Sequence, residues 1–267
     1  MSESTETFQL STQAAELYER KFVPALFGEW AAYLLDAADP QPGQAVLDVA
    51  CGTGVVAREA ADRLGGSGRV AGVDLNEGML EVARRIRPEL EWHRADVTSL
   101  PFEPASFDVV LCQAALMYFP DRVGALREMA RVLTPDGTLA VQVWGSLASQ
   151  PGYGPFADIV ARHAGSEALA LVGSYFTLGD LDLVVDLFES TGLAVSATST
   201  RLGTVRFASL DEFVAAEVEG TPMIEMIDDE VYERIRKESR DALAGFCSPD
   251  GGTEVPIEGH VVVARKQ

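Results

Sequence analysis

Residues 46–60, "VLDVACGTGVVAREA", read as a buried strand, a glycine turn and the start of a helix. Gly52 and Gly54 remove side chains where the chain must turn sharply and a ligand must come close. The helix that follows would point its free N–H groups and the positive end of its dipole at that ligand. The stretch "GTGVVA" also fits the dinucleotide pattern G-x-G-x-x-G/A. It therefore predicts a ligand site at the end of a strand, and leaves the identity of the ligand open.

Strand-like and helical patterns alternate on both sides of this stretch. Helical runs such as "NEGMLEVARRI" (76–86) and "DRVGALREMARVL" (121–133) separate the apolar runs, with Asn76 as the expected N-cap and "TPDG" (134–137) as a turn. The further strand candidates are "RVAGVD" (69–74), "LEWHRAD" (90–96), "FDVVLCQ" (107–113) and "TLAVQVW" (138–144). This alternation predicts βαβ units and a parallel sheet, with ligands beyond the carboxyl ends of the strands.

The flanking segments are less regular. Apolar residues recur at helical spacing over 11–38, and two further helices are expected at 156–164 and 181–192. Residues 194–207 and 258–266 read as strands, with acidic helical patterns between them. We interpret residues 208–246 as a helical insertion between these two strands.

The composition excludes several classes of partner. The 267 residues carry 41 acidic and 21 basic side chains, a net charge of −20. Such a charge argues against nucleic acid, whose phosphates need basic groups, and against stable association with an anionic membrane. The three cysteines and three histidines form no C-x-x-C or H-E-x-x-H motif, so neither a disulfide framework nor a metal site is expected. The polar start "MSESTETFQL" and the longest apolar run of 11 residues suggest a cytoplasmic chain.

Three aspartates narrow the choice of ligand. Asp74 ends the second strand, 20 residues after Gly54 (74 − 54), where a carboxylate accepts the hydroxyl hydrogens of a ribose. Asp96 ends the third strand and is a suitable acceptor for an adenine amino group. Asp48, four positions before Gly52, would repel a pyrophosphate but attract a ligand that carries an ammonium and a sulfonium. The pattern therefore predicts an adenosine-containing ligand and favours a cationic one.

Four segments in order resemble the class I S-adenosylmethionine-dependent methyltransferases, and most closely the type 11 branch with the ubiquinone/menaquinone C-methyltransferases. They are "VLDVACGTG" (46–54), "GVDLNEGML" (72–80), "ADVTSLPFEPASFDVVLCQAALMYFPD" (95–121) and "ALREMARVLTPDGTLAVQVW" (125–144). The resemblance implies an α/β fold: a Rossmann-like seven-stranded sheet, mostly parallel with an antiparallel last strand, plus a helical cap. It also implies direct SN2 transfer of a methyl group to the oxygen, nitrogen or carbon of a small-molecule acceptor.

The resemblance carries over to named cofactor-binding positions. Asp74 would hold the ribose, Asp48 would lie near the methionine amino group through a water, and Gln113 would face the methionine end and the methyl group. The quinone branch often has a small hydroxyl residue at the position of Gln113. This difference argues against a quinone as the acceptor but does not affect the expected cofactor. Tyr18 and Phe22 would form a lid. The full expected set is Tyr18, Phe22, Asp48, Ala50, Gly52, Thr53, Gly54, Asp74, Leu75, Met79, Asp96, Val97 and Gln113.

The resemblance also suggests a division of the chain. Residues 1–40 would be the helical lid, 41–146 the cofactor-binding core and 147–207 the cap helices with the sixth strand. Residues 208–246 would be the insertion, a solvated cap or a dimer surface, and 247–267 the final strand. The chain would work as a monomer or homodimer.

The catalytic residues stay unknown at this point, and two other functions stay open. Tyr118 and His163 are candidates for acid/base roles, although Tyr118 also suits a pocket wall and His163 a structural role. The chain can instead be a non-catalytic S-adenosylmethionine-binding protein. An NAD(P)-dependent oxidoreductase would share the glycine pattern, but no Tyr-x-x-x-Lys pair supports it.

Overall fold

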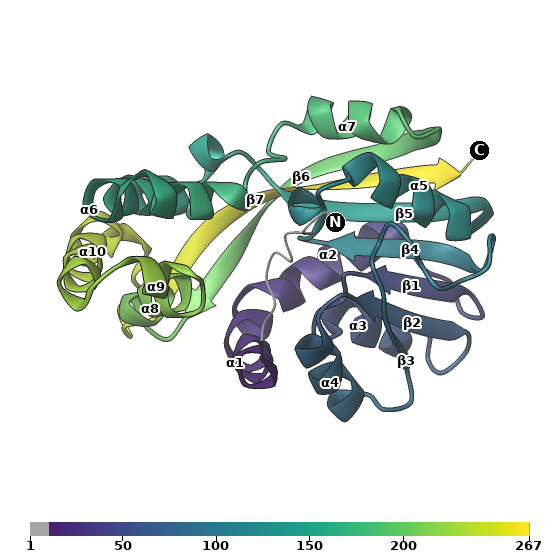
Figure 1. The fold of residues 1–267 in the computed structure, drawn as a ribbon, viewed down its shortest axis with the longest axis horizontal. Coiled ribbons are helices and arrows are strands. Elements are labelled where there is room, and N and C mark those ends of the chain that lie inside the picture. Colours follow the sequence, from purple (N-terminus) through teal and green to yellow (C-terminus); the bar gives the residue numbers. More distant parts are fainter. Residues whose placement is uncertain (1–10, 267) are drawn as a thin grey trace, which may run out of the picture.

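A computed structural model describes residues 11–266, and a seven-stranded sheet forms its centre (Figure 1). The spatial order of the strands is β3-β2-β1-β4-β5-β7-β6. Strand β7 runs antiparallel to β5 and β6, and the other neighbours pair in parallel, which confirms the predicted fold class. The strands are β1 (Ala45–Val49), β2 (Arg69–Asp74), β3 (Glu91–Arg94), β4 (Phe107–Gln113), β5 (Leu133–Trp144), β6 (Leu193–Phe207) and β7 (Thr253–Lys266).

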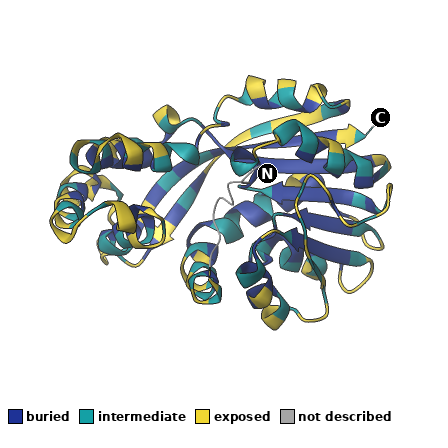
Figure 2. Cartoon of the chain, viewed as in Figure 1, coloured by how far each residue is buried: buried dark blue, intermediate teal, exposed yellow. Residues whose placement is uncertain are grey.

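Both faces of the sheet are covered by helices. Val46 of β1 packs in a core shared with α2 (Gly28–Ala38) and α3 (Val55–Arg63), whereas Leu47 packs in the core on the opposite face. Helices α5 (Arg122–Val132) and α7 (Leu181–Glu189) cover that second face. The buried positions of Figure 2 follow the central strands. A parallel strand covered on both sides is mainly apolar, which explains the apolar residues on either side of Asp48 at the start of the glycine motif.

The structure tests two predictions made from short sequence patterns, a helix N-cap at Asn76 and a turn at residues 134–137. Asn76 is the N-cap of α4 (Glu77–Ile86), and its Oδ1 accepts the Met79 N–H at 3.0 Å, as predicted. The prediction that the turn "TPDG" precedes the fifth strand is wrong, because β5 begins at Leu133 and contains these four residues as an irregular bulge. Pairing with β4 jumps from Leu133 to Thr138, and Asp136 takes a left-handed φ of 61°.

The long strands β6 and β7 extend beyond the rest of the sheet to a group of helices (Figure 1). These cap helices are α6 (Tyr153–Ser174), α8 (Leu210–Glu219), α9 (Met223–Met226) and α10 (Asp229–Ala242). The last three lie between β6 and β7 in the chain. No helix within residues 11–266 has the length and apolar character needed to cross a bilayer.

Helix α1 (Thr12–Phe22) and the π-helical turn Val23–Phe27 connect the core to the cap. Helix α1 packs against α4, and its Lys21 pairs with Glu212 of α8 at 2.6 Å. Residues 1–10 of the expected lid lie outside the described residues. Helix α1 therefore contacts both the core, at α4, and the cap, at α8.

Candidate functional site

A cavity of about 480 Å³ begins at the carboxyl ends of β1, β2 and β4 and continues under the cap. Its size is typical of a small-molecule site. The core side is lined by Val49, Ala50, Gly52, Val73, Asp74, Leu75, Asn76, Met79, Ala95, Asp96 and Val97. The other side is lined by Tyr118, Phe119, Trp144, Tyr153, Tyr175, Phe176, Val205, Glu217, Gly220, Thr221 and Ile257. The cavity therefore joins the predicted ligand site to an aromatic chamber.

The two glycines of the turn have different neighbours. Gly52 lines the cavity with φ +55°, and a Cβ added there would meet no protein atom closer than 4.0 Å. Gly54 does not line it; a Cβ at Gly54 would lie 2.3 Å from the ring of Trp92. The second glycine is thus required by its φ of +85° and by Trp92 rather than by the space for a ligand.

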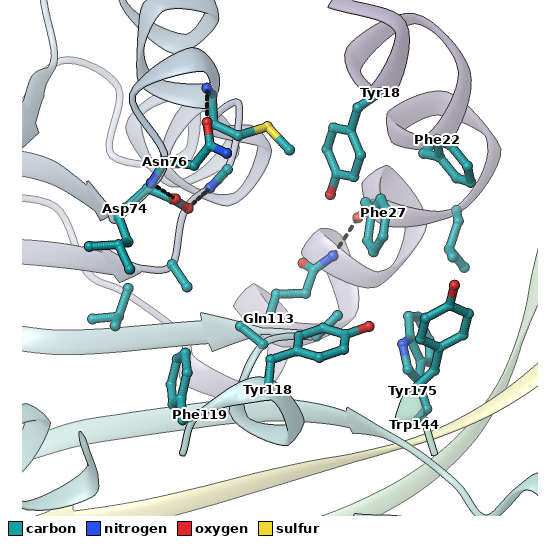
Figure 3. A pocket seen from close by; sticks show the side chains of 18 of the residues that line it. Tyr18, Phe22, Phe27, Asp74, Asn76, Gln113, Tyr118, Phe119, Trp144 and Tyr175 are labelled. Carbon is teal, nitrogen blue, oxygen red and sulfur yellow. Dashed lines mark hydrogen bonds between the residues drawn. The ribbon is translucent and has the colours of Figure 1, made fainter. Parts of the chain in front are cut away.

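Asp74 lies at the end of the cavity between the glycine turn and α4, which we call the Gly52–Asp74 corner. Its Oδ2 accepts the Gly52 N–H and its Oδ1 accepts the Asn76 N–H, both at 2.8 Å (Figure 3). Burial raises the pKa of this carboxyl, although these backbone donors oppose the effect. Because each carboxylate oxygen has a second lone pair, Asp74 can still accept two hydroxyl hydrogens from the cavity.

Asp48 and Thr53 lie behind the cavity wall. The Asp48 side chain is buried, and its Oδ2 accepts the Ala57 N–H in the first turn of α3 at 3.0 Å. Burial raises the pKa of Asp48 to about 8. The Thr53 hydroxyl is buried and has no hydrogen-bond partner within residues 11–266. Asp48 therefore anchors the start of α3 and has no surface on the cavity.

The third strand and the start of α4 supply the far wall. Asp96 lines the cavity, and its Oδ1 accepts the N–H and the hydroxyl of Thr98 at 2.8 and 2.7 Å, which fixes the loop after β3. Leu75 and Met79 line the same end, and the Leu75 side chain is 39% exposed. An apolar side chain left open beside two aspartates suits a flat, polar-edged ring such as adenine.

Tyr18 and Phe22 of α1 face the strand ends across the cavity (Figure 3). Their ring centroids are 5.8 Å apart, and Tyr18 also stacks on Phe27 at 5.2 Å. Burial raises the pKa of the Tyr18 hydroxyl well above its usual value, so this side chain is neutral. Helix α1 therefore contributes an aromatic wall.

Gln113 ends β4 and lies between the two parts of the cavity. In Figure 3 it stands between Asp74 on one side and Tyr175 on the other. Its Nε2 donates to the Phe27 carbonyl at 3.0 Å. Its Oε1 is buried and, among the described residues, has no hydrogen-bond partner. A buried acceptor without a donor is costly, so the site offers a place for a donor from a ligand.

Beyond Gln113 the walls are mainly aromatic. Tyr118 meets Tyr175 edge to face, with centroids 6.5 Å apart, and Tyr153 contacts Phe176 at 5.4 Å. Burial raises the pKa values of Tyr118, Tyr153 and Tyr175 far above the neutral range, which keeps all three phenols protonated. No lysine, arginine or histidine is among the described residues that line the cavity.

Sequence reasoning missed Glu217 of α8, which lines the aromatic chamber. Its side chain is buried, and its Oε1 accepts the Tyr153 hydroxyl at 2.7 Å. Burial raises the pKa of Glu217 to about 7. One signal was available: Glu217 follows Phe213 by four residues, so both lie on the apolar face of the helix.

His163 does not belong to the cavity. It lies on α6 and its Nε2 is 2.6 Å from Oε2 of Glu238 on α10. This pair joins two cap helices and is separate from the chamber. Of the two acid/base candidates, the structure places only Tyr118 at the cavity.

Comparison with known proteins agrees with this geometry. Residues 47–141 match the type 11 family described as a methyltransferase domain. Demethylmenaquinone methyltransferase of Renibacterium salmoninarum is 37% identical over 134 residues, 50% of this chain and 54% of that protein. The chain spans about half the length of the curated relatives it matches.

Solved structures of low sequence identity share the fold. A methyltransferase structure from Bacillus halodurans, described as putative, has a TM-score of 0.58 at 21% identity and covers 88% of this chain and 98% of its own. Phosphoethanolamine N-methyltransferase 2 of Haemonchus contortus, solved with S-adenosyl-L-methionine, has a TM-score of 0.60 at 20% identity, over 98% of this chain and 58% of its own. Residues 47–141 thus match a methyltransferase domain, and this part of the chain is similar to the demethylmenaquinone methyltransferases.

Proposed function

We propose that this protein transfers a methyl group from S-adenosylmethionine to a small-molecule acceptor. The observation that carries the proposal is the single cavity that joins the Gly52–Asp74 corner to the aromatic chamber across Gln113. A cofactor at the corner would present its reactive end toward Gln113, and an acceptor in the chamber would approach from the opposite side.

The residues at the corner fit this cofactor. Asp74 would accept the ribose hydroxyls, and Asp96 with the Val97 N–H would bind the adenine edge. The unpartnered Oε1 of Gln113 offers an acceptor to the ammonium group of the methionine part. When bound, S-adenosylmethionine supplies a methyl group already activated by its sulfonium charge.

The remaining predicted positions would act in two ways. Ala50, Gly52, Leu75 and Met79 line the same corner and would contact the cofactor through apolar surface and backbone, while Tyr18 and Phe22 cover it. The residues behind the wall, Asp48, Thr53 and Gly54, would shape the turn and act on the cofactor only through it.

The chemistry asks the protein mainly to align two reactants and to exclude water. Alignment of this kind can supply roughly 7–11 kcal/mol of the barrier. The aromatic side chains around the chamber would keep water away from the reacting atoms.

The proposal also covers the organisation of the chain and its setting. We propose that the chain divides into segments that end at residues 40, 146, 207 and 246. We further propose that the protein is cytoplasmic, binds no nucleic acid and works as a monomer or homodimer.

Calorimetry with S-adenosylhomocysteine and with NADH tests the function directly. We expect micromolar binding of S-adenosylhomocysteine and no binding of NADH. The reverse result would identify a dinucleotide site and an oxidoreductase. Binding of S-adenosylhomocysteine without turnover of any phenol, amine or quinol would identify a non-catalytic S-adenosylmethionine-binding protein.

A further inference from the structure

The aromatic chamber contains one carboxylate, which comes from a cap helix and not from the strand ends of the core. Glu217 lies on the buried face of α8 with 5% of its surface exposed, and it lines the same cavity as Gln113. Its Oε1 accepts the Tyr153 hydroxyl at 2.7 Å. Burying a carboxylate in apolar surroundings is costly, so its presence requires an explanation.

The charges around Glu217 define what this chamber can bind. Tyr153 donates to it, and burial together with the charge of Glu217 raises the pKa values of Tyr118 and Tyr175. Among the described residues, these three phenols are the titratable groups on which the charge of Glu217 acts. No positive side chain among the described residues lines the cavity. An acceptor with a phosphate or carboxylate would therefore meet a negative group and no counter-ion.

We propose, on the basis of the proposed function, that Glu217 is the general base of the methyl transfer and that the acceptor is an uncharged aromatic molecule with a phenol or enol hydroxyl. The aromatic walls suit an apolar ring. A carboxylate suits a hydroxyl because it accepts the hydroxyl hydrogen. An amine fits less well, because a nearby carboxylate stabilises its ammonium form, which has no free lone pair.

The proton and electron changes balance without another reactant. The acceptor hydroxyl passes its proton to the Glu217 carboxylate, and its oxygen forms a bond to the methyl carbon. The bond from that carbon to sulfur breaks, and its electron pair stays on the sulfur, which becomes a neutral thioether. With a pKa near 7, Glu217 is partly ionised at neutral pH and suited to this transfer.

Glu219 provides a matched control on the same helix. It accepts the hydroxyl of Tyr232 at 2.8 Å, as Glu217 accepts that of Tyr153, but this pair is exposed. The test therefore compares the wild type with Glu217→Gln and Glu219→Gln. Both glutamines keep the size of the side chain and remove its charge.

The experiment first measures S-adenosylhomocysteine binding by all three proteins, which we expect to agree within about threefold. Turnover is then measured with 2-naphthol, 1-naphthol and 1,4-dihydroxynaphthalene, and with 2-naphthylamine and 2-naphthoic acid as comparisons. We expect oxygen methylation of at least one hydroxyl compound, a loss of kcat of roughly 10²–10⁴-fold in Glu217→Gln, and no change in Glu219→Gln. The absorption spectrum of 2-naphthol bound beside S-adenosylhomocysteine gives a second reading, because naphthol and naphtholate absorb differently.

Because the ionised carboxylate of Glu217 opposes a second negative charge beside it, we expect bound 2-naphthol to ionise at higher pH in the wild type than in Glu217→Gln. Equal ionisation of the naphthol in both proteins would place Glu217 away from the acceptor hydroxyl and overturn its role. Failure of the wild type to bind S-adenosylhomocysteine would overturn the proposed function itself. Binding of that product without methylation of any hydroxyl compound, or methylation of the amine or acid alone, would overturn only the acceptor assignment. Activity of Glu217→Gln within threefold of the wild type would overturn the assignment of Glu217 as the general base.

Discussion

The carboxylate of Asp74 accepts the backbone N–H of Gly52 at 2.8 Å and thereby joins the ends of two neighbouring parallel strands into one corner. The same side chain holds the Asn76 N–H at the start of α4. One aspartate thus sets the positions of the glycine turn and the next helix, while its remaining lone pairs face the cavity.

Replacement of Asp74 should weaken cofactor binding strongly. Hydrogen bonds to charged groups contribute about 1.5–3 kcal/mol each, so Asp74→Ala should reduce affinity for S-adenosylhomocysteine roughly 100-fold or more. Calorimetry measures the change, and circular dichroism checks the fold. Asp62→Ala, which removes an exposed partner of Arg87, is the control. A folded Asp74→Ala protein with unchanged affinity would contradict the assignment.

Gly54→Ala should lower stability through packing rather than through the ligand. The new Cβ would meet the Trp92 ring and require a left-handed φ of +85°. The free energy of unfolding should fall by roughly 2–5 kcal/mol, from overpacking and backbone strain together. Urea unfolding measures it. Gly173→Ala, where a Cβ meets no atom within 4 Å, should leave the midpoint nearly unchanged or raise it; equal effects at both positions would argue against the role of Trp92.

Glu217 should make stability depend on pH. Its folded pKa of about 7 lies above the usual 4.5, so its contribution is fully present below about pH 4.5 and is lost as pH rises to 7. Glu217→Gln removes this cost and should be more stable than the wild type by roughly 3 kcal/mol above pH 7. Unfolding curves from pH 5 to 8 test this. A constant difference between the two proteins across that range would refute the pKa assignment.

Tyr153→Phe should change the pH profile of catalysis. The Tyr153 hydroxyl donates to Glu217 and lowers its pKa, so its removal should raise the pKa of the base. The rising limb of kcat/KM should then move to higher pH, with activity recovered at alkaline pH. Tyr232→Phe removes the equivalent donor to exposed Glu219 and should leave the limb in place. A loss of activity that is equal at every pH would indicate packing instead.

Local sequence patterns predicted the core of the fold and the residues at the Gly52–Asp74 corner of the site. Alternating apolar runs predicted β1–β5, and an aspartate at the carboxyl end of a strand must lie near the other strand ends of a parallel sheet. Asp74 and Asp96 follow this rule and line the cavity. Asp48 lies inside its strand rather than at the end, so a linear reading cannot tell that it turns under α3.

The acceptor side was not readable in the same way. Tyr118, Tyr153, Tyr175 and Glu217 are spread over about 100 residues of the chain, and the fold brings them together around one cavity. The acidic insertion suggested an exposed surface because most glutamates are solvated. Only the packing of α8 against the chamber shows that Glu217 is on the inward face and Glu219 is exposed.

The sequence by itself therefore determined the succession of strands and helices in the core, the glycine turn and the aspartates at the strand ends, because these depend on neighbours a few residues away. The tertiary structure alone decided that Gly54 makes room for Trp92, that Asp48 lies behind the wall and that Glu217 enters the chamber. These three outcomes depend on which face of an element meets a distant one, and the long-range packing of the apolar core sets that face.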